Sequence, residues 1–354
     1  MTSSTPAQIL LTGATGFIGG TILTCLLESD HPALKAASIT CLVRGAERAD
    51  TVSSAYGVRV RPVVYGGIDD LEATTKAASQ ADLVIGATLG FHPSSAQALL
   101  RGLAQRKAAT GRHVWMIHLS GASNLADQPI TGAYLEERTF DGLADDVYGY
   151  EKHREALRHY PERATELGVK TLVVMPPTIY GVGTGLFNRK SIQIPAYVRA
   201  VLELGSGVVV GEGAGQANHV HVEDLAELYR LVVLAIMDNG GANLPTGKKG
   251  IVFGENGLHT WMDIAQGIAD ACHEEGRIKD RSIRSIDLED AGKYLKSYMD
   301  LVGGNFVELE LGLCANSRTN SSIARRLGWK LSRGEEAWKR AFGENLHAVL
   351  RAQM

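Results

Sequence analysis

The chain has 354 residues, of which 45% are hydrophobic and 21% are charged. This is ordinary globular composition, and the length suffices for one large domain or two smaller ones. Lysine and arginine total 36 against 39 acidic residues, which gives a formal net charge of −3. Because no block of like charge stands out, we expect no nucleic-acid partner.

Neither a membrane span nor an export signal is expected. The chain contains no run of about 18 apolar residues, the length that crosses a bilayer. Its first residues, Met-Thr-Ser-Ser-Thr-Pro, lack the basic start of a signal peptide. The four cysteines, Cys25, Cys41, Cys272 and Cys314, form no CxxC pair, so no metal site is expected. These features favour a cytoplasmic protein.

Short apolar runs alternate with helix-length segments through the first two-thirds of the chain. Strands are predicted at Gln8–Thr12, Ser38–Val43, Val58–Val64, Ala81–Ala87, His113–Leu119 and Lys170–Met175. Helices are predicted at Phe17–Glu28, Leu71–Ser79, Ser94–Ala109 and Tyr148–Leu167, the last interrupted by Pro161. Apolar runs without strict alternation indicate strands that are buried on both faces. The alternation predicts an α/β fold with a Rossmann-type, doubly wound parallel sheet.

The pattern changes after Pro176, where glycine-rich loops appear at residues 181–185 and 205–215. Further helices are predicted at Val222–Asp238, Trp261–Glu274, Leu288–Met299 and Gly334–Leu350. We therefore expect a smaller, mostly helical C-terminal domain that binds substrate. The expected bounds are residues 1–180 and 219–258 for the sheet domain, and residues 181–218 and 259–354 for the substrate domain.

A glycine-rich motif follows the first predicted strand and opens the first predicted helix. Residues 12–19 read Thr-Gly-Ala-Thr-Gly-Phe-Ile-Gly. Gly13 permits a tight turn, Gly16 lets the backbone approach a pyrophosphate, and Gly19 lets the helix pack closely on the strand. The helix N-terminus then offers free N–H groups to phosphates. A turn without a ligand is the alternative, but strand, motif and helix occur in the order that dinucleotide binding requires.

The end of the second predicted strand distinguishes the two nicotinamide dinucleotides. NAD sites usually place an acidic residue there, which binds the ribose 2′-hydroxyl. Arg44 occupies that place, with Arg48 close behind it. A guanidinium pairs with a 2′-phosphate, so the sequence predicts NADP(H) rather than NAD(H). The alternative is an ordinary arginine in an exposed loop.

Tyr148 and Lys152 are four residues apart in a predicted helix, which places both side chains on one face. A tyrosine has an unperturbed pKa near 10. A neighbouring ammonium favours the phenolate and lowers this pKa toward the neutral range, where the tyrosine can act as acid or base. Taken alone, such a pair occurs by chance in many proteins.

Two serines follow the fifth predicted strand, at Ser120 and Ser123. The carboxyl ends of strands are where ligands bind in open α/β sheets. A hydroxyl at that edge can donate a hydrogen bond to a substrate carbonyl. A polar strand end whose hydroxyl caps backbone is an equally good reading for either serine.

These motifs together resemble the extended branch of the short-chain dehydrogenase/reductase superfamily. That branch includes nucleotide-sugar epimerases and dehydratases, dihydroflavonol and cinnamoyl-CoA reductases, and 3β-hydroxysteroid dehydrogenases. The resemblance covers most of the chain and rests on motifs in the family's order: TGxxGxxG at 12–19, YxxxK at Tyr148 and Lys152, an RPxxxYG-like segment at Met175–Gly181, a YIHVxDLA-like segment at His219–Asp224, and LGW at Leu327–Trp329. Arg44 is more similar to the reductases than to the epimerases.

The resemblance implies roles for individual residues. Tyr148 and Lys152 would be catalytic together with Ser120 or Ser123. The cofactor would contact Gly13, Thr15, Gly16, Phe17, Ile18, Gly19, Arg44, Ile68, Ala87, Thr88, Lys152, Pro176, Thr178 and Ile179. Position alone suggests a substrate pocket formed by His92, Tyr134, Tyr180, Phe187 and His219, although each also reads as a packing or surface residue. A homodimer through the helices Ser94–Ala109 and Tyr148–Tyr160 would be common in the family.

Departures from the family pattern bear on the substrate. The usual catalytic serine or threonine aligns with Gly121, between Ser120 and Ser123, and Gly67 replaces the acidic residue after the third strand. Two arginines that hold the diphosphate of nucleotide sugars align with Ala217 and Glu310. A glutamate there would repel a diphosphate. Residues that could substitute as cations are Arg189, Lys190 and Arg318.

The sequence thus predicts an NADP(H)-dependent oxidoreductase that transfers hydride between the nicotinamide and a carbonyl or alcohol of a small organic substrate. One alternative is an NAD(P)-dependent nucleotide-sugar epimerase or dehydratase. A second alternative is a non-catalytic regulator that senses the dinucleotide, and the intact Tyr148–Lys152 pair argues against it.

Overall fold

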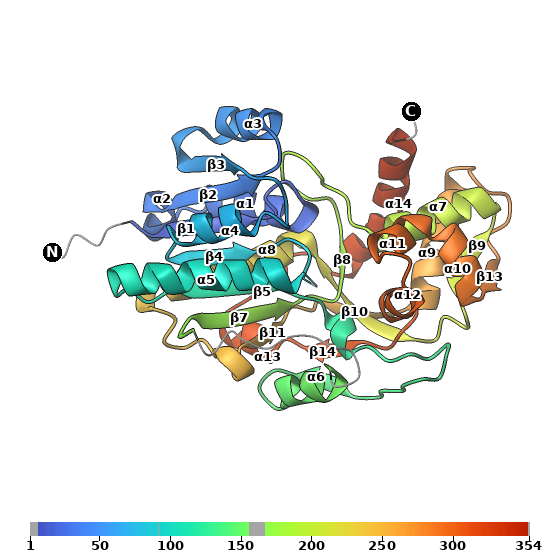
Figure 1. The fold of residues 1–354 in the computed structure, drawn as a ribbon. Helices are drawn as coiled ribbons and strands as arrows, with labels where there is room; N and C mark the ends of the chain where they lie inside the picture. Colours follow the sequence, from blue (N-terminus) through green and yellow to red (C-terminus); the bar gives the residue numbers. More distant parts are fainter. Residues whose placement is uncertain (1–5, 91, 156–166, 353–354) are drawn as a thin grey trace.

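A seven-stranded parallel sheet forms the centre of the N-terminal part of the molecule (Figure 1). The computed structural model describes residues 6–90, 92–155 and 167–352. The strand order is β11-β7-β5-β4-β1-β2-β3. The strands are β1 (Gln8–Thr12), β2 (Ser38–Val43), β3 (Val60–Val64), β4 (Leu83–Gly86), β5 (Trp115–Leu119), β7 (Lys170–Met175) and β11 (Ile251–Phe253). Because the order reverses between β1 and β4, the sheet is doubly wound, and a binding crevice is expected at that point.

Helices cover both faces of this sheet, because its strands carry apolar side chains on both faces. In β1, Ile9 and Leu11 face one core, which they share with α1 (Phe17–Glu28) and α8 (Val222–Asn239). Leu10 faces the opposite core, which it shares with α4 (Leu71–Ala78) and α5 (Pro93–Thr110). β1 is therefore buried on both faces, which is typical of parallel sheets.

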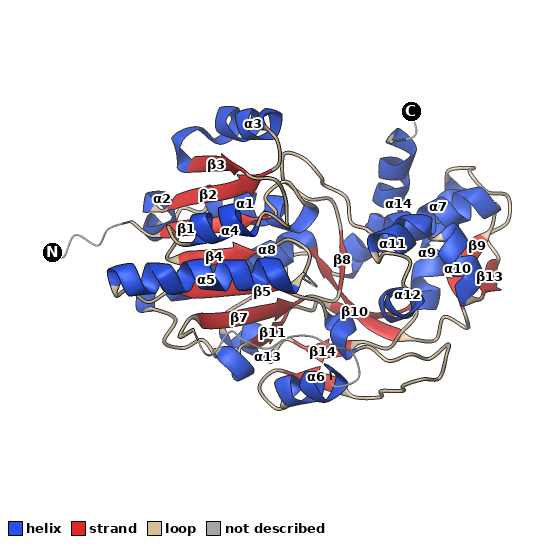
Figure 2. Ribbon diagram, viewed as in Figure 1, coloured by secondary structure: helices blue, strands red, loops and turns tan. Residues whose placement is uncertain are grey.

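A second core lies in the C-terminal part, which is mostly helical (Figure 2). Its helices are α7 (Gln193–Leu204), α9 (Trp261–Glu274), α10 (Leu288–Tyr294), α11 (Lys296–Leu301), α12 (Phe306–Leu313) and α14 (Glu335–Arg351). Small sheets lie between this part and the first: one contains β8 (Thr178–Tyr180), β10 (Gln216–His221) and β12 (Gly257–Thr260), and another pairs β6 (Thr139–Asp141) with β14 (Arg318–Asn320). β9 (Gly207–Val210) pairs with β13 (Ile283–Ile286) within the helical part.

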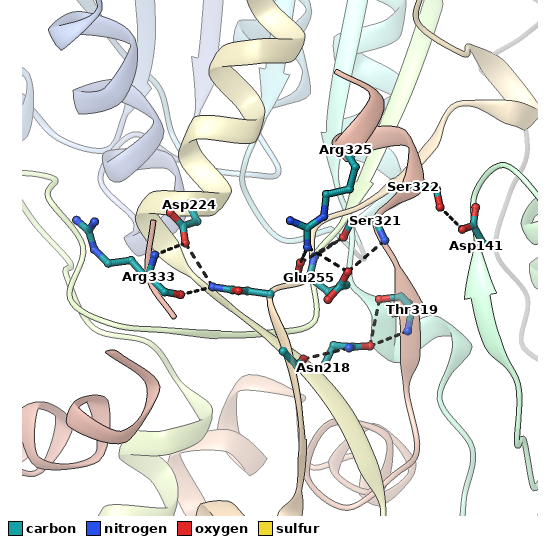
Figure 3. A network of polar contacts seen from close by, with 11 residues as sticks. Asp141, Asn218, Asp224, Glu255, Thr319, Ser321, Ser322, Arg325 and Arg333 are labelled. Atoms are coloured by element: carbon teal, nitrogen blue, oxygen red, sulfur yellow. Dashed lines mark hydrogen bonds and ion pairs between the residues drawn. The ribbon is translucent and has the colours of Figure 1, made fainter. Parts of the chain in front are cut away.

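Buried polar contacts hold β10, α8 and the segment after α13 (Ser322–Arg326) together (Figure 3). Asp224 is 2% exposed, and its carboxylate accepts hydrogen bonds from the backbone N–H groups of Ser332 and Arg333, each at 3.0 Å. The Trp329 indole donates to the Asp224 carbonyl at 2.7 Å. The segments that resemble the family's YIHVxDLA and LGW motifs therefore contact each other in the fold.

The predicted fold class is confirmed, with local differences. The third strand begins at Val60, because Gly57–Arg59 form a turn of 3-10 helix after α3 (Ala46–Tyr56). The helix predicted at Leu288–Met299 is two helices, α10 and α11, which meet at Leu295. The sequence prediction missed β11, α7 and α12, as well as α2 (Pro32–Ala36) and α3.

Some predictions are not tested by the structure. α6 is described at Val147–Glu155, whereas Pro161, Tyr160 and the rest of the predicted helix up to residue 166 lie outside the described residues. The domain bounds drawn from the sequence stay a prediction, as does the homodimer. Among the described residues, no helix is both long and apolar enough to cross a membrane.

Candidate active site

The loop after β1 has the shape of a cradle for phosphates. Gly13 has a φ of +75°, and a Cβ there would lie 2.2 Å from the carbonyl oxygen of Ala87 at the end of β4. A Cβ on Gly19 would lie 2.3 Å from the Gly13 carbonyl oxygen. Gly13 is required because its backbone conformation is one that other residues rarely adopt. At Gly13 and at Gly19 alike, no side chain would fit in the space available.

The N-terminus of α1 points its backbone donors toward this cradle. Gly16 is the N-cap residue and has no side chain with which to cap the helix. The first helical bond runs from the Gly20 N–H to the Gly16 carbonyl at 2.9 Å. The N–H groups of residues 17–19 precede it and lack helical partners, which is the arrangement that binds a pyrophosphate. The residues present thus fit a dinucleotide.

Arg44 directly follows β2, at the carboxyl edge of the sheet where the loop after β1 also lies, and its side chain is exposed. Its Cδ atom lies 3.8 Å from the place that a Cβ on Gly67 would take. Gly67 itself has a φ of +128°, a conformation that favours glycine. The turn before Ile68 therefore passes beside the Arg44 side chain, at the position where an adenosine ribose lies in this kind of fold.

A cavity of about 220 Å³ opens beside the carboxyl ends of β5 and β7. The sheet side of its wall contains Ser120, Gly121, Ala122 and Ser123 after β5, and Pro176, Pro177, Thr178 and Ile179 after β7, together with Phe17 and Ile18 of α1. The opposite side contains Ser191, Ile192, Gln193, Ala217, Trp261, Tyr298, Leu311, Gly312 and Ser317. No acidic, lysine, arginine or histidine side chain lines the cavity in the described part of the chain.

The cavity brings together several residues that the sequence predicted separately. Both serines line it, next to Phe17 and Ile18 of the glycine motif and next to Pro176, Thr178 and Ile179 of the predicted cofactor set. The Ser120 hydroxyl accepts a hydrogen bond from the Asn124 side chain at 3.2 Å.

The backbone between the two serines is extended at Gly121, whose φ of −151° is one that any residue adopts. The chain turns in the short 3-10 helix η2 (Ala122–Leu125), which contains Ser123. The Ala122 N–H donates to the Pro176 carbonyl at 3.0 Å, which fixes this loop beside the end of β7.

Tyr148 and Lys152 do not line the cavity in this structure. The Tyr148 ring packs against the small apolar cluster that contains Val147 and Met175. The Lys248 ammonium lies 5.1 Å from the centre of the Tyr148 ring. Lys152 is exposed. The predicted pair is on one helix, as expected, but neither side chain is part of the cavity wall that contains the two serines.

Asn124 connects α6 to the serine loop. Its side-chain amide donates to the Ser120 hydroxyl and also, at 3.0 Å, to the carboxylate of Glu151 in α6. The backbone carbonyl of Asn124 accepts a hydrogen bond from the Arg154 guanidinium at 3.0 Å. Since Glu151 precedes Lys152 directly, the YxxxK turn is tied to Ser120 through one intervening side chain.

Most of the predicted substrate residues have structural contacts instead. His92 caps α5 by accepting from the Ser95 N–H at 3.2 Å. The Tyr134 hydroxyl lies 2.7 Å from the Tyr150 hydroxyl and donates to Glu136 at 2.9 Å. The Phe187 side chain packs against the first core. None of these three side chains is part of the cavity wall.

Tyr180 and His219 are buried in the second core, 0% and 3% exposed. The His219 ring stacks on Trp338 of α14 with 4.0 Å between ring centres. The Tyr180 ring meets His219 edge-on at 5.5 Å. Both residues pack against α14 and are not part of the wall of the cavity, so their role in substrate binding stays a prediction.

Glu310 is not part of the cavity wall, and its carboxylate is paired with donors elsewhere. It is 0% exposed, and its carboxylate accepts from the Ile130 N–H at 2.7 Å and from the Thr131 N–H and hydroxyl at 3.0 Å each. Ala217, in the other diphosphate position, lines the cavity. The cations considered as substitutes, Arg189, Lys190 and Arg318, all donate to other groups of the protein and do not line the cavity.

Sequence reasoning missed most of the far side of the cavity wall. Ser191, Gln193 and Tyr298 belong to no recognised motif, and they come from segments that meet only in the folded chain. The sole local signal for a cavity residue was a hydroxyl or amide side chain among apolar residues. Such side chains are common at helix ends, where they bond to backbone, so the signal does not distinguish the two roles.

The fold and the glycine cradle define a Rossmann-type dinucleotide-binding protein with a substrate cavity at the carboxyl edge of its sheet. The model of the NAD dependent epimerase/dehydratase family matches residues 9–243, and the chain belongs to this family. It is thus a member of an enzyme family whose relatives are NAD-dependent oxidoreductases, epimerases and dehydratases of the extended short-chain type.

Among curated proteins, the chain is 32% identical to oxidase ucsJ from an Acremonium species over 302 residues, 80% of this chain and 84% of that protein. It is 28% identical to an uncharacterized protein from Saccharomyces cerevisiae, with the same coverage of 80% and 84%. The fold is similar to that of dTDP-glucose 4,6-dehydratase DesIV from Streptomyces venezuelae, solved with NAD bound (TM-score 0.61, 15% identity, 98% of this chain and 97% of that chain). It is also similar to UDP-glucose 4-epimerase from Thermotoga maritima (TM-score 0.59, 14% identity, 98% and 100%).

Proposed function

We propose that this protein is an NADP(H)-dependent oxidoreductase that reduces a carbonyl group, or oxidises the corresponding alcohol, on a small uncharged organic molecule. The observation that carries the proposal is the cavity wall. Two serine hydroxyls lie at the carboxyl edge of the sheet, and all the other lining side chains are uncharged. An apolar cavity with a few convergent polar groups is typical of small-molecule sites.

The cofactor would lie along the carboxyl edge of the sheet. Its pyrophosphate would take the N–H groups of α1 between Gly13 and Gly19, and the 2′-phosphate would pair with Arg44. Phe17, Ile18, Thr178 and Ile179 would hold its nicotinamide end, because they line the cavity beside the serines. When bound, the reduced dinucleotide supplies a hydride to the carbonyl carbon.

The protein's own groups would handle the proton and the oxygen. Ser120 or Ser123 would donate a hydrogen bond to the carbonyl oxygen, where negative charge develops. The Tyr148 hydroxyl would give that oxygen its proton as the carbon gains hydride, and Lys152 would favour the resulting phenolate. This role requires the Tyr148 hydroxyl to reach the cavity in the catalytic complex, and Asn124 connects α6 to Ser120.

Nucleotide-sugar epimerisation or dehydration fits the cavity less well. A diphosphate needs cationic donors, and the wall offers none in the described part of the chain. The neighbours that act on nucleotide sugars are 14% and 15% identical, a level at which only the fold is shared.

The test is turnover with purified protein, followed by the loss of NADPH absorbance. Unbranched methyl ketones and aromatic aldehydes are offered in parallel with UDP-glucose and dTDP-glucose. We expect reduction of at least one carbonyl compound and no change in either nucleotide sugar. Tyr148→Phe should lower kcat by about 10²–10⁴-fold, the usual loss for a general acid.

Tyr294→Phe is the control, because it removes a tyrosine hydroxyl that packs against the C-terminal core, outside the cavity wall and outside the cluster around Tyr148. Near-normal turnover in Tyr148→Phe would exclude the proposed proton donor. Product formation from a nucleotide sugar, with no reduction of any carbonyl compound, would replace the proposed reaction by the epimerase or dehydratase alternative.

A further inference from the structure

Hydroxyl and amide side chains, one of them a buried hydroxyl without a hydrogen-bond partner among the described residues, line the side of the cavity opposite the sheet. Ser191 is 7% exposed, and its hydroxyl is completely buried with no partner in the described part of the chain. It lines the cavity directly before Ile192 and α7. A buried hydroxyl without a partner costs folding free energy, so its retention in a cavity wall indicates a ligand group that it binds.

Tyr298 reaches the same wall from α11. Its hydroxyl lies against Gly312, where a Cβ would be 1.7 Å from the phenol oxygen. Gly312 is in α12 with an ordinary helical conformation, so space for the phenol explains the glycine here. Tyr298 packs against the second core and lines the cavity. Glycine at position 312 thus lets a polar group enter the cavity wall.

Gln193 completes this group from the first turn of α7. Its side-chain amide donates to the Gly312 carbonyl at 2.7 Å. The same glycine therefore contacts Gln193 through its carbonyl and Tyr298 through its Cα, which places the two side chains next to each other. Because its N–H₂ group is engaged by Gly312, the amide carbonyl of Gln193 is the part that can accept from a ligand.

We propose that Ser191, Gln193 and Tyr298 form a second polar subsite, which binds an uncharged hydroxyl or carbonyl group at the end of the substrate remote from the reacting carbonyl. This inference rests on the proposed function. The three residues determine specificity, and the reacting atoms lie elsewhere, beside Ser120 and Ser123.

The chemistry of the wall defines the substrate class. The remote group is uncharged, because no cation or carboxylate in the described chain lines the cavity to pair with an ion. A carbonyl there can accept from the Tyr298 and Ser191 hydroxyls, and a hydroxyl can in addition donate to the amide oxygen of Gln193. The middle of the substrate is apolar, because Ile192, Trp261 and Leu311 line the space near the subsite. The substrate class is therefore a carbonyl compound with an apolar body and a second hydroxyl or carbonyl group at its far end.

The test compares ligand pairs that differ only in the remote group. The probes are unbranched methyl ketones of increasing chain length and the same ketones with a terminal hydroxyl. Binding to protein saturated with NADP⁺ is measured by calorimetry, which needs no turnover. At one chain length, the hydroxy ketone should bind about tenfold more tightly than its parent, the range for a few neutral hydrogen bonds.

Tyr298→Phe and Ser191→Ala should each reduce that preference about three- to tenfold, while the affinity for the parent ketone changes less than about twofold. Tyr294→Phe, the matched control, should keep the full preference. The subsite is overturned if no chain length shows a preference, including the case of no detectable binding, or if both variants retain it.

The same probes separate the subsite from the proposed function. If ketones bind with the expected preference but are never reduced by NADPH, the subsite stands and the proposed reaction fails. If they are reduced and the hydroxyl makes no difference to binding, the reaction stands and the subsite fails.

Discussion

Arg44 is the residue on which cofactor choice depends. It is exposed directly after β2, beside the turn at Gly67. A charge-assisted pair with the 2′-phosphate is worth roughly 1–3 kcal/mol, so NADPH should bind about tenfold or more tightly than NADH. Arg44→Asp should erase or reverse this preference, because a carboxylate repels the phosphate and accepts from a 2′-hydroxyl.

Fluorescence titration of both reduced cofactors measures this effect. Arg61→Asp makes the same charge change at another exposed position and should leave the ratio of affinities unchanged. Equal affinities for NADPH and NADH in the unmutated protein would show that Arg44 does not select the cofactor.

Asp127 shows how a single buried carboxylate can hold a loop that no motif marks. It is 1% exposed and accepts from the Asn316 N–H and side-chain amide at 2.8 Å each. It also accepts from the Glu136 N–H at 3.3 Å. These bonds join the segment after η2 to the segment before β14, and so fix one side of the cavity that contains Ser317.

At the scale of elements, the contact between β10, β12 and α14 contains two buried histidines. The His219 and His259 rings face each other with 3.2 Å between their Nδ1 atoms, so one must donate and the other accept. The accepting ring must be neutral, and burial disfavours a charge on either ring. Burial lowers the pKa of His219 to about 4 and the pKa of His259 well below its usual value, and the charge of His219 lowers the latter further.

This pair should make the protein sensitive to acid. In the unfolded chain both histidines gain protons below about pH 6.5. The folded protein keeps them neutral until lower pH, so the unfolded state binds more protons and the free energy of unfolding falls as pH decreases from about 6.5 toward 4. Each proton contributes up to about 1.4 kcal/mol per pH unit.

Urea unfolding at a series of pH values measures that slope. His259→Gln should flatten it over this range, although the variant is less stable at neutral pH because a buried ring is lost. His273→Gln removes an exposed histidine of α9 and should leave the slope unchanged. A His259→Gln slope equal to that of the unmutated protein would contradict this account.

At the scale of the whole molecule, Glu310 joins the two parts of the chain. Its buried carboxylate in α12 binds three donors in the loop at Ile130 and Thr131, 179 and 180 positions away in sequence. Glu310→Ala would leave these donors without an acceptor. We expect the free energy of unfolding to fall by roughly 2–4 kcal/mol, as is usual when a buried charged acceptor is removed.

Chemical denaturation measures this loss. Glu336→Ala is the control, since Glu336 is 94% exposed and its ion pair with Arg340 is 3.9 Å long. That substitution should change stability by less than about 0.5 kcal/mol. A Glu310→Ala protein as stable as the control would mean that the loop bonds contribute nothing to the joining of the two parts.

Features that depend on neighbouring residues were predicted well from the sequence. β1, β2, β7, α1 and α9 begin and end where the apolar runs and turn residues indicate. The glycine motif was also readable, because Gly13 and Gly19 are required by backbone conformation and close packing within one strand–turn–helix unit. β11 was missed because a strand of three residues, Ile251–Phe253, has too few positions for a pattern.

The substrate side of the cavity could not be predicted in the same way. Tyr180 and His219 looked like pocket residues because they follow the sheet's carboxyl edge, but Trp338 of α14 covers them. Ser191 belongs to no predicted element and Tyr298 lies in a predicted helix, and only the meeting of α7, α11 and α12 brings them to one wall. Local sequence carries no information about which distant helix covers a side chain.

The sequence by itself determined the doubly wound sheet, the dinucleotide cradle at Gly13–Gly19 and the spacing of Tyr148 and Lys152 on one helix, because each follows from short-range geometry. The tertiary structure alone decided which side chains line the cavity, that Glu310 binds the loop at Ile130 and Thr131, and that Asn124 connects α6 to Ser120. These depend on contacts between segments up to 180 positions apart, as in the bond between Ile130 and Glu310. Such contacts form only when both cores are packed, so no local pattern of residues encodes them.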